Sequence, residues 1–292
     1  MTKTIILISL ILILDLGFYF LFISKKLMNP KLEKSMIEEV KPQLNTKIKT
    51  EPEIKNKISI ITVYDNYQVD PRLKTGWGFS ALVKTKNQNI LFDTGAGSET
   101  LLSNMEKMEI DSKKIEMIVL FHIHGDHIGG LEGFLEKNGN VKVYIPASFP
   151  DSIREKIESF GGEYRDVLEP SEISGGVYST GELGILIKEQ SLILNSEKGL
   201  IIITGCAHPG IVDIVKRTKE IFPKEKVYLV LGGFHLAEAS DSELKGIIAD
   251  FRELGVGKVA PCHCSGDRCR ELFKQEYQND FIENGVGRII EI

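Results

Sequence analysis

Short apolar runs alternate with longer amphipathic stretches from about Ile58 to the end of the chain. The short runs are rich in valine and isoleucine, which is typical of strands, whereas the longer stretches repeat apolar residues at helical spacing. This alternation predicts an α/β fold in which buried strands lie among helices. Strands are expected at 58–64, 78–83, 89–93, 115–121, 141–145, 183–188, 191–195, 200–204, 227–231 and 258–261, and helices at 98–108, 152–160, 211–222, 240–254 and 265–275.

Two of the predicted helices begin with residues typical of helix N-caps. Ser98 is a candidate N-cap for the helix that follows it, because a serine hydroxyl can accept a hydrogen bond from a free backbone N–H. Ser240, with Glu243 three residues later, has the spacing of a capping box. The sequence therefore predicts where these helices begin as well as that they exist.

The N-terminal segment is of a different kind. The nineteen residues from Ile5 to Ile23 are apolar except for a serine, an aspartate, a glycine and a tyrosine. A helix of that length spans about 28 Å, close to the hydrocarbon thickness of a bilayer. No small-x-small cleavage site follows it, which favours an uncleaved anchor over a cleaved signal peptide. Asp15 opposes insertion by about 2.5–3.5 kcal/mol, which the flanking leucines and isoleucines offset.

Residues 25–57 are rich in lysine, glutamate, proline and asparagine, a composition that predicts a solvated, charged tether. More lysines follow the apolar segment than precede it, and the positive-inside rule then places the folded domain in the cytoplasm. We therefore expect a transmembrane helix over residues 1–24, a tether over 25–57 and one α/β domain over 58–292. This organisation predicts a single-pass membrane localisation.

Charge and cysteine content narrow the range of functions. The 292-residue chain has a formal net charge of −5, and no basic stripe accompanies the histidine segments, so nucleic acid is not an expected partner. Four cysteines are too few for a disulfide framework. Cys262, Cys264 and Cys269 lie close to His263 in the sequence, which indicates thiols near a metal ion.

All six histidines lie in four short segments that contain or adjoin glycine. His122, His124 and His127 share one of these segments with Asp126, directly after a predicted buried strand. Residues two apart in an extended segment face the same way, so His122 and His124 can point into one site. Gly125 permits the sharp reversal that brings the next two donors to it. Incidental loop polarity is the alternative, but four donors in six residues favour a transition-metal site.

The pattern His-x-His-x-Asp-His after an apolar strand resembles the signature of the metallo-β-lactamase superfamily. Upstream, Leu-Phe-Asp-Thr-Gly at 91–95 resembles the superfamily's first motif, in which the aspartate, here Asp93, orients metal-binding histidines. The resemblance covers the whole predicted domain and implies a four-layer αββα sandwich with the metal site at one edge, between two sheets. Three further segments are similar to the dihydropterin synthase-like branch of that superfamily: 204–210, 232–236 and 261–266.

The resemblance also implies two divalent metal ions. Histidine and aspartate ligands suit zinc, manganese and iron alike, and zinc is the first expectation. Six residues are the implied ligands: His122, His124 and His208 on the first ion, and Asp126, His127 and His263 on the second.

Cys206 departs from the superfamily pattern. It stands where many members have an aspartate that bridges the metals, and the residues before the hairpin, Ile-Lys-Glu-Gln-Ser at 187–191, contain no histidine. Two interpretations of Cys206 stay open, a thiolate ligand or a small buried residue beneath the site. Cys262 and Cys264 flank His263 and are expected to point to the opposite face from it.

Three more residues are candidates for contact with a substrate. His235 follows an apolar strand and two glycines, so it is either a satisfied core histidine or a phosphate contact and proton donor. His235 and Asp126 are the candidate catalytic residues. Ser265 and Gly266 open a predicted helix whose free N–H groups form a candidate phosphate pocket.

Three functions are compatible with a two-metal site. The resemblance implies, first, a synthase that joins a hydroxymethyl-dihydropterin diphosphate to a ribofuranosyl-aminobenzene phosphate, with the metals on the diphosphate. A phosphoester or phosphodiester hydrolase is the second. A membrane-tethered metal or ligand sensor without turnover is the third, although a complete ligand set argues against it. Both enzymes take a small phosphorylated substrate, and the sequence carries no signal for an oligomeric state.

Overall fold

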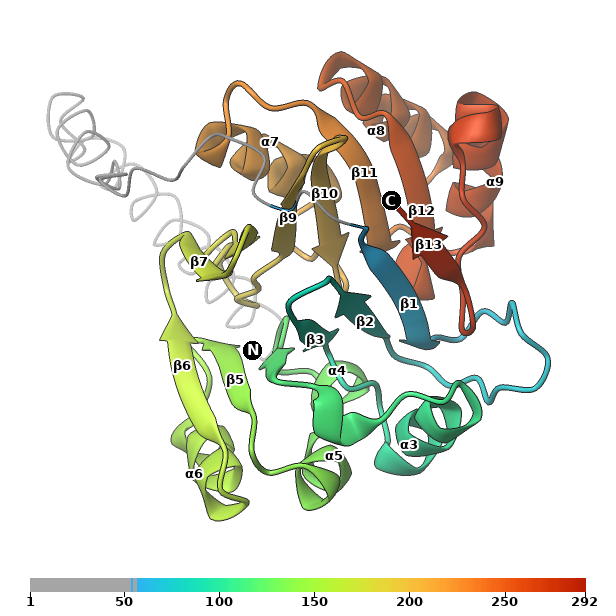
Figure 1. The fold of residues 1–292 in the computed structure, drawn as a ribbon. Helices are drawn as coiled ribbons and strands as arrows, with labels where there is room; N and C mark the ends of the chain where they lie inside the picture. The colour runs from blue at the N-terminus through green and yellow to red at the C-terminus, as the bar shows by residue number, and fades with distance from the viewer. Residues whose placement is uncertain (1–53, 55–56) are drawn as a thin grey trace, which may run out of the picture. The chain divides into compact units, whose positions relative to one another are not determined.

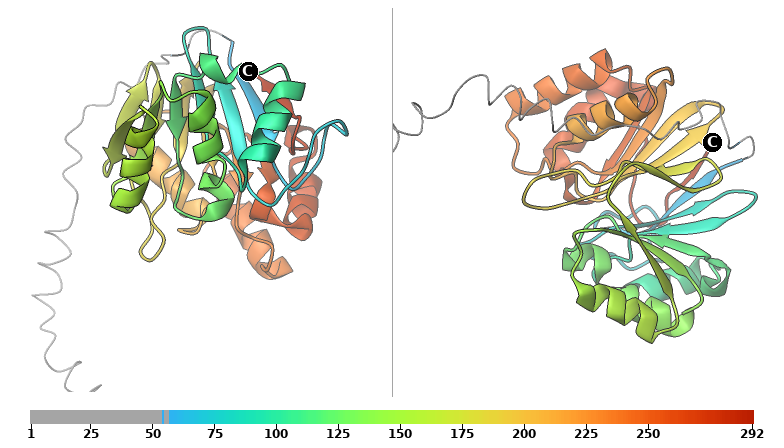
Figure 2. Two further views of the ribbon diagram at one scale, coloured as in Figure 1. Left: turned by 90° about the horizontal axis from the view of Figure 1, so that it is seen from below. Right: turned by 90° about the vertical axis from the view of Figure 1, so that its left-hand side faces the viewer.

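The computed structural model describes residue 54 and residues 57–292, which belong to one compact unit. Two β-sheets lie face to face in this unit, and helices cover the outer side of each sheet (Figures 1 and 2). The order from one side to the other is therefore helices, sheet, sheet, helices. The predicted α/β sandwich is confirmed.

The first sheet has seven strands within the described residues, in the order β13-β1-β2-β3-β4-β5-β6. From β13 to β3 each strand is antiparallel to the next one in this order, whereas β3, β4, β5 and β6 run parallel to one another. Parallel neighbours need crossover connections, and helices lie between them in the chain. The strands are β1 (Ser59–Tyr64), β2 (Ser80–Lys84), β3 (Asn89–Phe92), β4 (Met117–Val119), β5 (Lys142–Pro146), β6 (Glu163–Val167) and β13 (Ile289–Glu291).

The second sheet has six described strands in the order β12-β11-β10-β9-β8-β7. Strands β10, β11 and β12 are parallel. Their carboxyl ends therefore leave the sheet at the same edge, where the histidine segments begin. The strands are β7 (Ser171–Ser174), β8 (Val177–Ser179), β9 (Leu192–Ser196), β10 (Gly199–Thr204), β11 (Val227–Gly233) and β12 (Lys258–Cys262).

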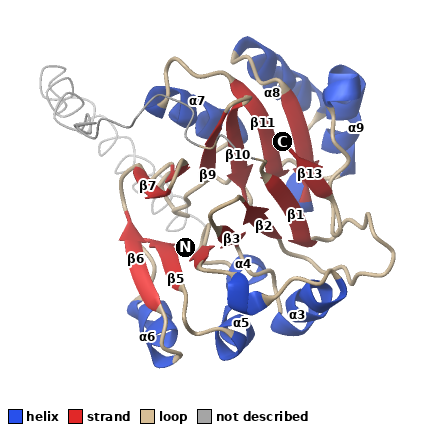
Figure 3. Ribbon diagram, viewed as in Figure 1, coloured by secondary structure: helices blue, strands red, loops and turns tan. Residues whose placement is uncertain are grey.

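Helices α3, α5 and α6 pack on the outer face of the first sheet, and α7, α8 and α9 on that of the second (Figure 3). Between the sheets lies an apolar core that includes the fully buried Phe79, Phe92 and Phe121. Each such side chain contributes about 1.5–3 kcal/mol by leaving water. The helices are α3 (Ser98–Lys107), α4 (Gly125–Ile128), α5 (Leu131–Lys137), α6 (Asp151–Ser159), α7 (Ile211–Ile221), α8 (Asp241–Glu253) and α9 (Asp267–Tyr277), with 3₁₀ turns at Ser112–Lys114, His263–Ser265 and Gln278–Asp280.

The predicted helix starts have different outcomes. The capping box is confirmed, because the Ser240 hydroxyl accepts from the Glu243 N–H and the Glu243 carboxylate accepts from the Ser240 N–H. The N-cap role of Ser98 is wrong. Gly97 takes that position without a side-chain hydrogen bond, and Ser98 is the first helical residue.

The strand predicted at 183–188 is also wrong. Leu183 forms an isolated bridge with Glu189, and the residues between them make a surface loop. Ile185 and Leu186 in this loop are 91% and 97% exposed, so the apolar run does not mark a buried strand. The sequence pattern did not predict strands β6, β7, β8 and β13. The mostly exposed Glu-Tyr-Arg-Asp-Val of β6 shows why, since an edge strand needs no apolar period.

The predicted membrane anchor lies outside the described residues, as does most of the predicted tether. Ile54 is described and buried, and its N–H donates to the Asn195 carbonyl. Across the described residues, no helix combines the length and the apolar surface needed to cross a bilayer. The longest, α8, has thirteen residues, whereas a spanning helix needs about twenty. The prediction of a membrane localisation is corrected on this finding.

Candidate metal centre

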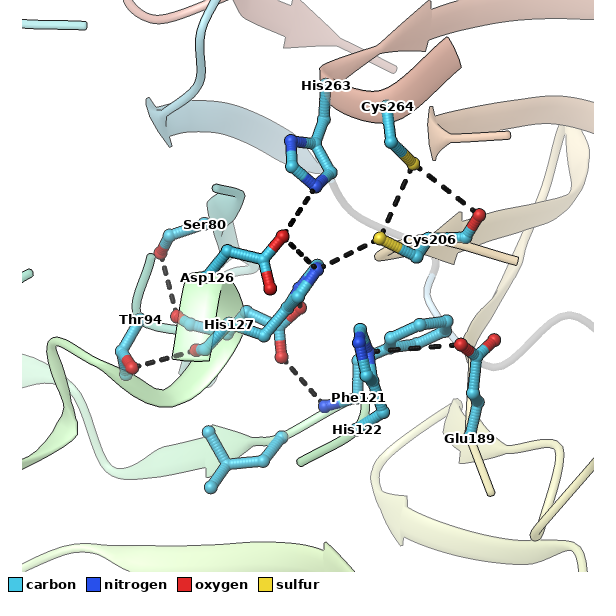
Figure 4. Close-up of polar contacts among 12 residues, drawn as sticks. Ser80, Thr94, Phe121, His122, Asp126, His127, Glu189, Cys206, His263 and Cys264 are labelled. Atoms are coloured by element: carbon cyan, nitrogen blue, oxygen red, sulfur yellow. Dashed lines mark hydrogen bonds and ion pairs between the residues drawn. The ribbon is translucent and has the colours of Figure 1, made fainter. Parts of the chain in front are cut away.

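The histidine segments meet at one edge of the sandwich, between the two sheets. His122 and His124 follow β4, and α4 carries Asp126 and His127 one turn later. From the second sheet, Cys206 and His208 follow β10, His235 follows β11 and His263 follows β12. Figure 4 shows side chains from the two sheets pointing toward one another at this edge.

His122, His124 and His208 form the first group of donors. One ligand atom from each lies within 4.8 Å of the others, and the ring centroids are 4.5–5.2 Å apart. His122 is fully buried, and neither of its ring nitrogens has a hydrogen-bond partner among the described residues. The nearest carboxylate oxygen, from Glu189, is 3.9 Å from its Nδ1.

Asp126, His127, Cys206 and His263 form the second group, also within 4.8 Å. The Asp126 carboxylate lies 3.3 Å from Nε2 of His263 and 3.6 Å from Nε2 of His127. The same nitrogen of His127 is 3.1 Å from Sγ of Cys206 (Figure 4). Cys206 also belongs to a third set with His208 and His235, so its thiol lies between the two groups.

The protonation of the histidines suits metal binding. Burial, followed by the nearby His263, lowers the pKa of His127 to about 3. Burial and then His127 lower the pKa of His122 as well. Both rings are therefore neutral at pH 7 and keep a lone pair, which is the ligand form of imidazole.

The two groups fit divalent metal ions. A buried polar group without a hydrogen-bond partner costs about 1–3 kcal/mol, and His122 has two such nitrogens. Convergent imidazole, carboxylate and thiol donors match the ligand preferences of zinc and related metals. An ion in each group would satisfy the donors that the protein leaves unpaired.

Asp93 contacts the first histidine segment at two points, the Phe121 backbone and the His127 ring. Its carboxylate accepts from the Phe121 N–H at 2.7 Å and lies 2.6 Å from Nδ1 of His127. Burial raises the pKa of Asp93. The contact fixes the His127 ring so that Nε2 faces the second group, which is the arrangement expected of a ligand oriented by a carboxylate.

Glu189 is a site residue that the sequence did not reveal. It is 1% exposed, its carboxylate contacts Nδ1 of His208, and it accepts from the His208 backbone N–H at 3.0 Å. His208 thereby presents Nε2 to the first group. In the sequence, residues 187–191 stand out only because they contain no histidine. A single glutamate beside a lysine carries no sequence signal of burial.

A second unforeseen contact supports His263. Asn66 Oδ1 lies 3.2 Å from Nδ1 of His263, and the Asn66 amide donates to the His263 carbonyl at 3.3 Å. The His263 N–H donates to Asp65 at 3.4 Å. The loop after β1 thus orients a donor that lies almost 200 residues later in the chain.

The remaining predicted residues lie near the centre but differ in exposure. His235 is exposed, and its ring centroid is 4.3 Å from that of His208. Ser265 is fully buried, where it accepts from the Phe234 N–H and donates to the Cys262 carbonyl. Its hydroxyl therefore supports the turn and is not open to a substrate. Gly266 has φ +81° and packs against Ala237.

The orientation expected for Cys264 is wrong. Residues 263–265 form a 3₁₀ turn rather than an extended strand, so side chains do not alternate there. The Cys264 thiol faces the centre, 3.4 Å from Sγ of Cys206 (Figure 4). Cys262 is buried away from it and accepts from the Asn284 amide.

Comparison with known proteins identifies the family. The metallo-β-lactamase superfamily model matches residues 76–215. A 7,8-dihydropterin-6-methyl-4-(β-D-ribofuranosyl)-aminobenzene-5'-phosphate synthase of Methanocaldococcus jannaschii is 31% identical over 73% of this chain and 89% of its own length. The chain belongs to the metallo-β-lactamase superfamily.

Two further similarities agree with this membership. The crystal structure of a metal-dependent hydrolase of the β-lactamase superfamily has a TM-score of 0.67 and 27% identity, and covers 80% of this chain and 99% of its own. A ribonuclease Z of Alkaliphilus oremlandii is 32% identical over 40% of this chain and 38% of its own length. The relatives are enzymes, and this superfamily member is likewise a metal-dependent enzyme with candidate histidine and aspartate metal groups.

Proposed function

We propose that this protein is a synthase that joins a pterin-methyl diphosphate to an arylamine that carries a ribose phosphate. The observation that carries the proposal is the 31% identity to the Methanocaldococcus synthase, which extends over 89% of that enzyme. In the reaction, the amine nitrogen bonds to the methylene carbon, the carbon–oxygen bond to diphosphate breaks, and the amine gives up one proton.

The ligand assignment is part of the proposal. His122, His124 and His208 would hold one divalent ion, while Asp126, His127 and His263 would hold another. Cys206 would be a shared ligand, because its thiol belongs to donor sets on both sides. Zinc is the first candidate, and manganese and iron suit the same donors. When bound, such ions would supply positive charge that stabilises a diphosphate oxygen as negative charge develops on it.

The protein's own side chains position the substrates and the proton. His235 is exposed beside His208, where it can contact the leaving diphosphate and carry the amine proton. Asp126 holds its carboxylate between two histidines. Burial opposes the ionisation of Asp126, but the hydrogen bond from His263 and the electrostatic influence of His127 and His263 outweigh it and lower the pKa of Asp126 to about 2. Asp126 is therefore a carboxylate throughout the neutral range.

Hydrolysis of a phosphoester is the alternative supported by the partial similarity to ribonuclease Z. The two reactions differ in the bond that breaks and in the nucleophile. In the synthase an amine attacks the methylene carbon and the carbon–oxygen bond to diphosphate breaks, whereas in the hydrolase water attacks phosphorus and a phosphorus–oxygen bond breaks. The sensor is the third hypothesis, and it requires bound metal without turnover.

One experiment separates the three hypotheses. The full chain is loaded with zinc and incubated with 6-hydroxymethyl-dihydropterin diphosphate, with and without the ribofuranosyl-aminobenzene phosphate, and the products are identified by mass spectrometry. We expect the joined product and diphosphate release that depends on the amine. Pterin alcohol formed without the amine, or turnover of bis-p-nitrophenyl phosphate alone, would establish the hydrolase. Stoichiometric metal with no product from any of these compounds would establish the sensor.

A further inference from the structure

Trp77 is the only tryptophan of the chain, and it is 57% exposed. The other large hydrophobic residues with comparable exposure in the described part of the chain are leucines and isoleucines. An indole ring is among the largest apolar groups that a core can bury. Its exposure beside the metal centre therefore calls for a partner that the described residues do not supply.

The backbone around Trp77 is fixed to the metal centre on both sides. The Gly76 N–H donates to the Asp65 carbonyl at 3.1 Å, and the Phe79 N–H donates to the Asp126 carbonyl at 3.2 Å. Gly78 has φ +146°, and a Cβ there would lie 2.4 Å from the Asp126 carbonyl oxygen. The segment cannot move away without disturbing Asp126, so the backbone that carries the indole is held beside the metal centre.

The indole ring borders both the metal centre and a cavity. Its centroid is 4.9 Å from that of the His263 ring, tilted by 54°. The cavity has a volume of about 740 Å³ and is also lined by His235 and Cys264. Cavities of this size accommodate small organic ligands. One end of this cavity is thus formed by residues of the metal centre.

Carboxylates line another part of the cavity. Glu238, Glu243 and Asp250 are among the lining residues, and no described lysine or arginine is. Ionised carboxylates only accept hydrogen bonds, so this wall favours a ligand edge rich in N–H donors. It also disfavours a phosphate group, which is then directed toward the metal groups.

We propose that this cavity binds the planar pterin ring of the substrate, with Trp77 stacked on the ring face and the carboxylates accepting hydrogen bonds from its amino-pyrimidine edge. The inference rests on the proposed function, since it assigns one of the two substrates to a place in the same site. It makes Trp77 a specificity-determining residue. It also sets the direction of binding, with the ring toward α8 and the diphosphate toward His235 and the metals.

The single tryptophan allows a direct test. The zinc-loaded full chain is titrated with 6-hydroxymethylpterin, and separately with inorganic diphosphate, while tryptophan emission is recorded. We expect saturable quenching by the pterin. Trp77→Ala should weaken pterin binding by roughly 5- to 150-fold, as expected for the loss of one aromatic stacking contact, when measured by the anisotropy of the pterin's own fluorescence.

Three variants keep the test independent of folding. Trp77→Phe retains an aromatic face and should bind the pterin much more tightly than Trp77→Ala. The double variant Glu238→Gln/Asp250→Asn leaves Trp77 in place and should weaken pterin binding by about tenfold. Leu168→Ala, at an apolar residue that is 59% exposed and lines neither this cavity nor the one beside His208, should bind the pterin like the parent.

The outcomes separate this inference from the proposed function. Pterin binding that leaves tryptophan emission unchanged, or that Trp77→Ala does not weaken, overturns the inference. Diphosphate binding by a protein that does not bind the pterin also overturns the inference. The proposed metal site would still be supported by that result. Pterin quenching that depends on Trp77, in a protein that forms no joined product, supports the inference and contradicts the synthase.

Discussion

At the residue scale, the candidate metal centre contains buried donor atoms that the described residues leave without a hydrogen-bond partner. His122 has no exposed surface and no hydrogen-bond partner among the described residues for either ring nitrogen. Asp93 and Glu189 each hold one ring nitrogen of another histidine. Both ring nitrogens of His122 and Nε2 of His263 have no hydrogen-bond partner among the described residues. This division between held and unpaired nitrogens leads to two predictions.

The first prediction is that His124→Ala removes metal and activity together. The side chain is exposed, so its loss should not disturb folding, but the first group loses one of its three donors. We expect about one metal equivalent less per chain by elemental analysis, and no measurable synthase product. Ile123→Ala, at the neighbouring position that is 37% exposed, is the control and should keep its metal. Full metal content in His124→Ala would contradict the ligand assignment.

The second prediction concerns Glu189→Gln, which keeps the shape of a buried side chain but removes its charge. The His208 ring would lose the charged carboxylate that orients it. Loss of such a contact weakens metal binding by about 10- to 100-fold. Competition with a chromophoric chelator measures the affinity, and saturating metal should still fill the site. The matched control is Glu197→Gln, an exposed acid in the turn between β9 and β10, and equal affinities for the two variants would refute the role.

At the element scale, the parallel strands β10, β11 and β12 bring three separate segments to one edge. The strands are in close contact where they end. Gly232 on β11 pairs with Thr204 on β10 and has φ +116°. A Cβ at this position would lie 1.8 Å from the Thr204 carbonyl oxygen. The glycine therefore permits the spacing that places His208 beside His235.

We predict that Gly232→Ala is strongly destabilising. The steric overlap and the left-handed backbone together should lower the free energy of unfolding by about 3 kcal/mol or more. Urea denaturation followed by circular dichroism measures this difference. Gly246→Ala is the control, because this glycine is in the interior of α8 and a Cβ there meets nothing within 4 Å. That variant should gain about 0.5–1 kcal/mol, and comparable stability of the two variants would contradict the argument.

At the scale of the whole described unit, the candidate metal groups draw their donors from both sheets. The segment after β4 supplies His122, His124 and His127, and the strands of the second sheet lead to His208 and His263. The apolar core between the sheets holds them together without a ligand. Metal ions shared between the two sides would add to that stability, because only the folded state brings the donors together.

Metal removal should therefore lower stability as well as activity. A ligand present at about 100 times its dissociation constant stabilises the folded state by about 2.7 kcal/mol for each site. We expect a chelator to lower the urea midpoint of the full chain, and added zinc to restore it. In His124→Ala the decrease should be smaller, since one group is already incomplete. Identical midpoints with and without chelator would show that the ions do not join the sheets.

The sequence alone determined the features that lie within short segments. The apolar periods of β10, β11 and α7 predicted those elements because each depends on its own residues. The first histidine segment predicted a metal site because four donors lie within six residues after a buried strand. So short a segment can adopt few conformations after the strand. Donors that are close in the sequence must therefore also be close in space.

Only the tertiary structure decided which distant side chains complete the site. Glu189 lies 19 residues before the His208 that it holds, and Asn66 lies 197 residues before His263. Neither they nor Trp77 differ in the sequence from ordinary surface residues. Their roles arise when the two sheets close over a common core, because that packing places them against the histidines. Local sequence patterns predict the strands and the metal-binding donors, whereas the contacts of Glu189, Asn66 and Trp77 with the histidines depend on how the two sheets pack.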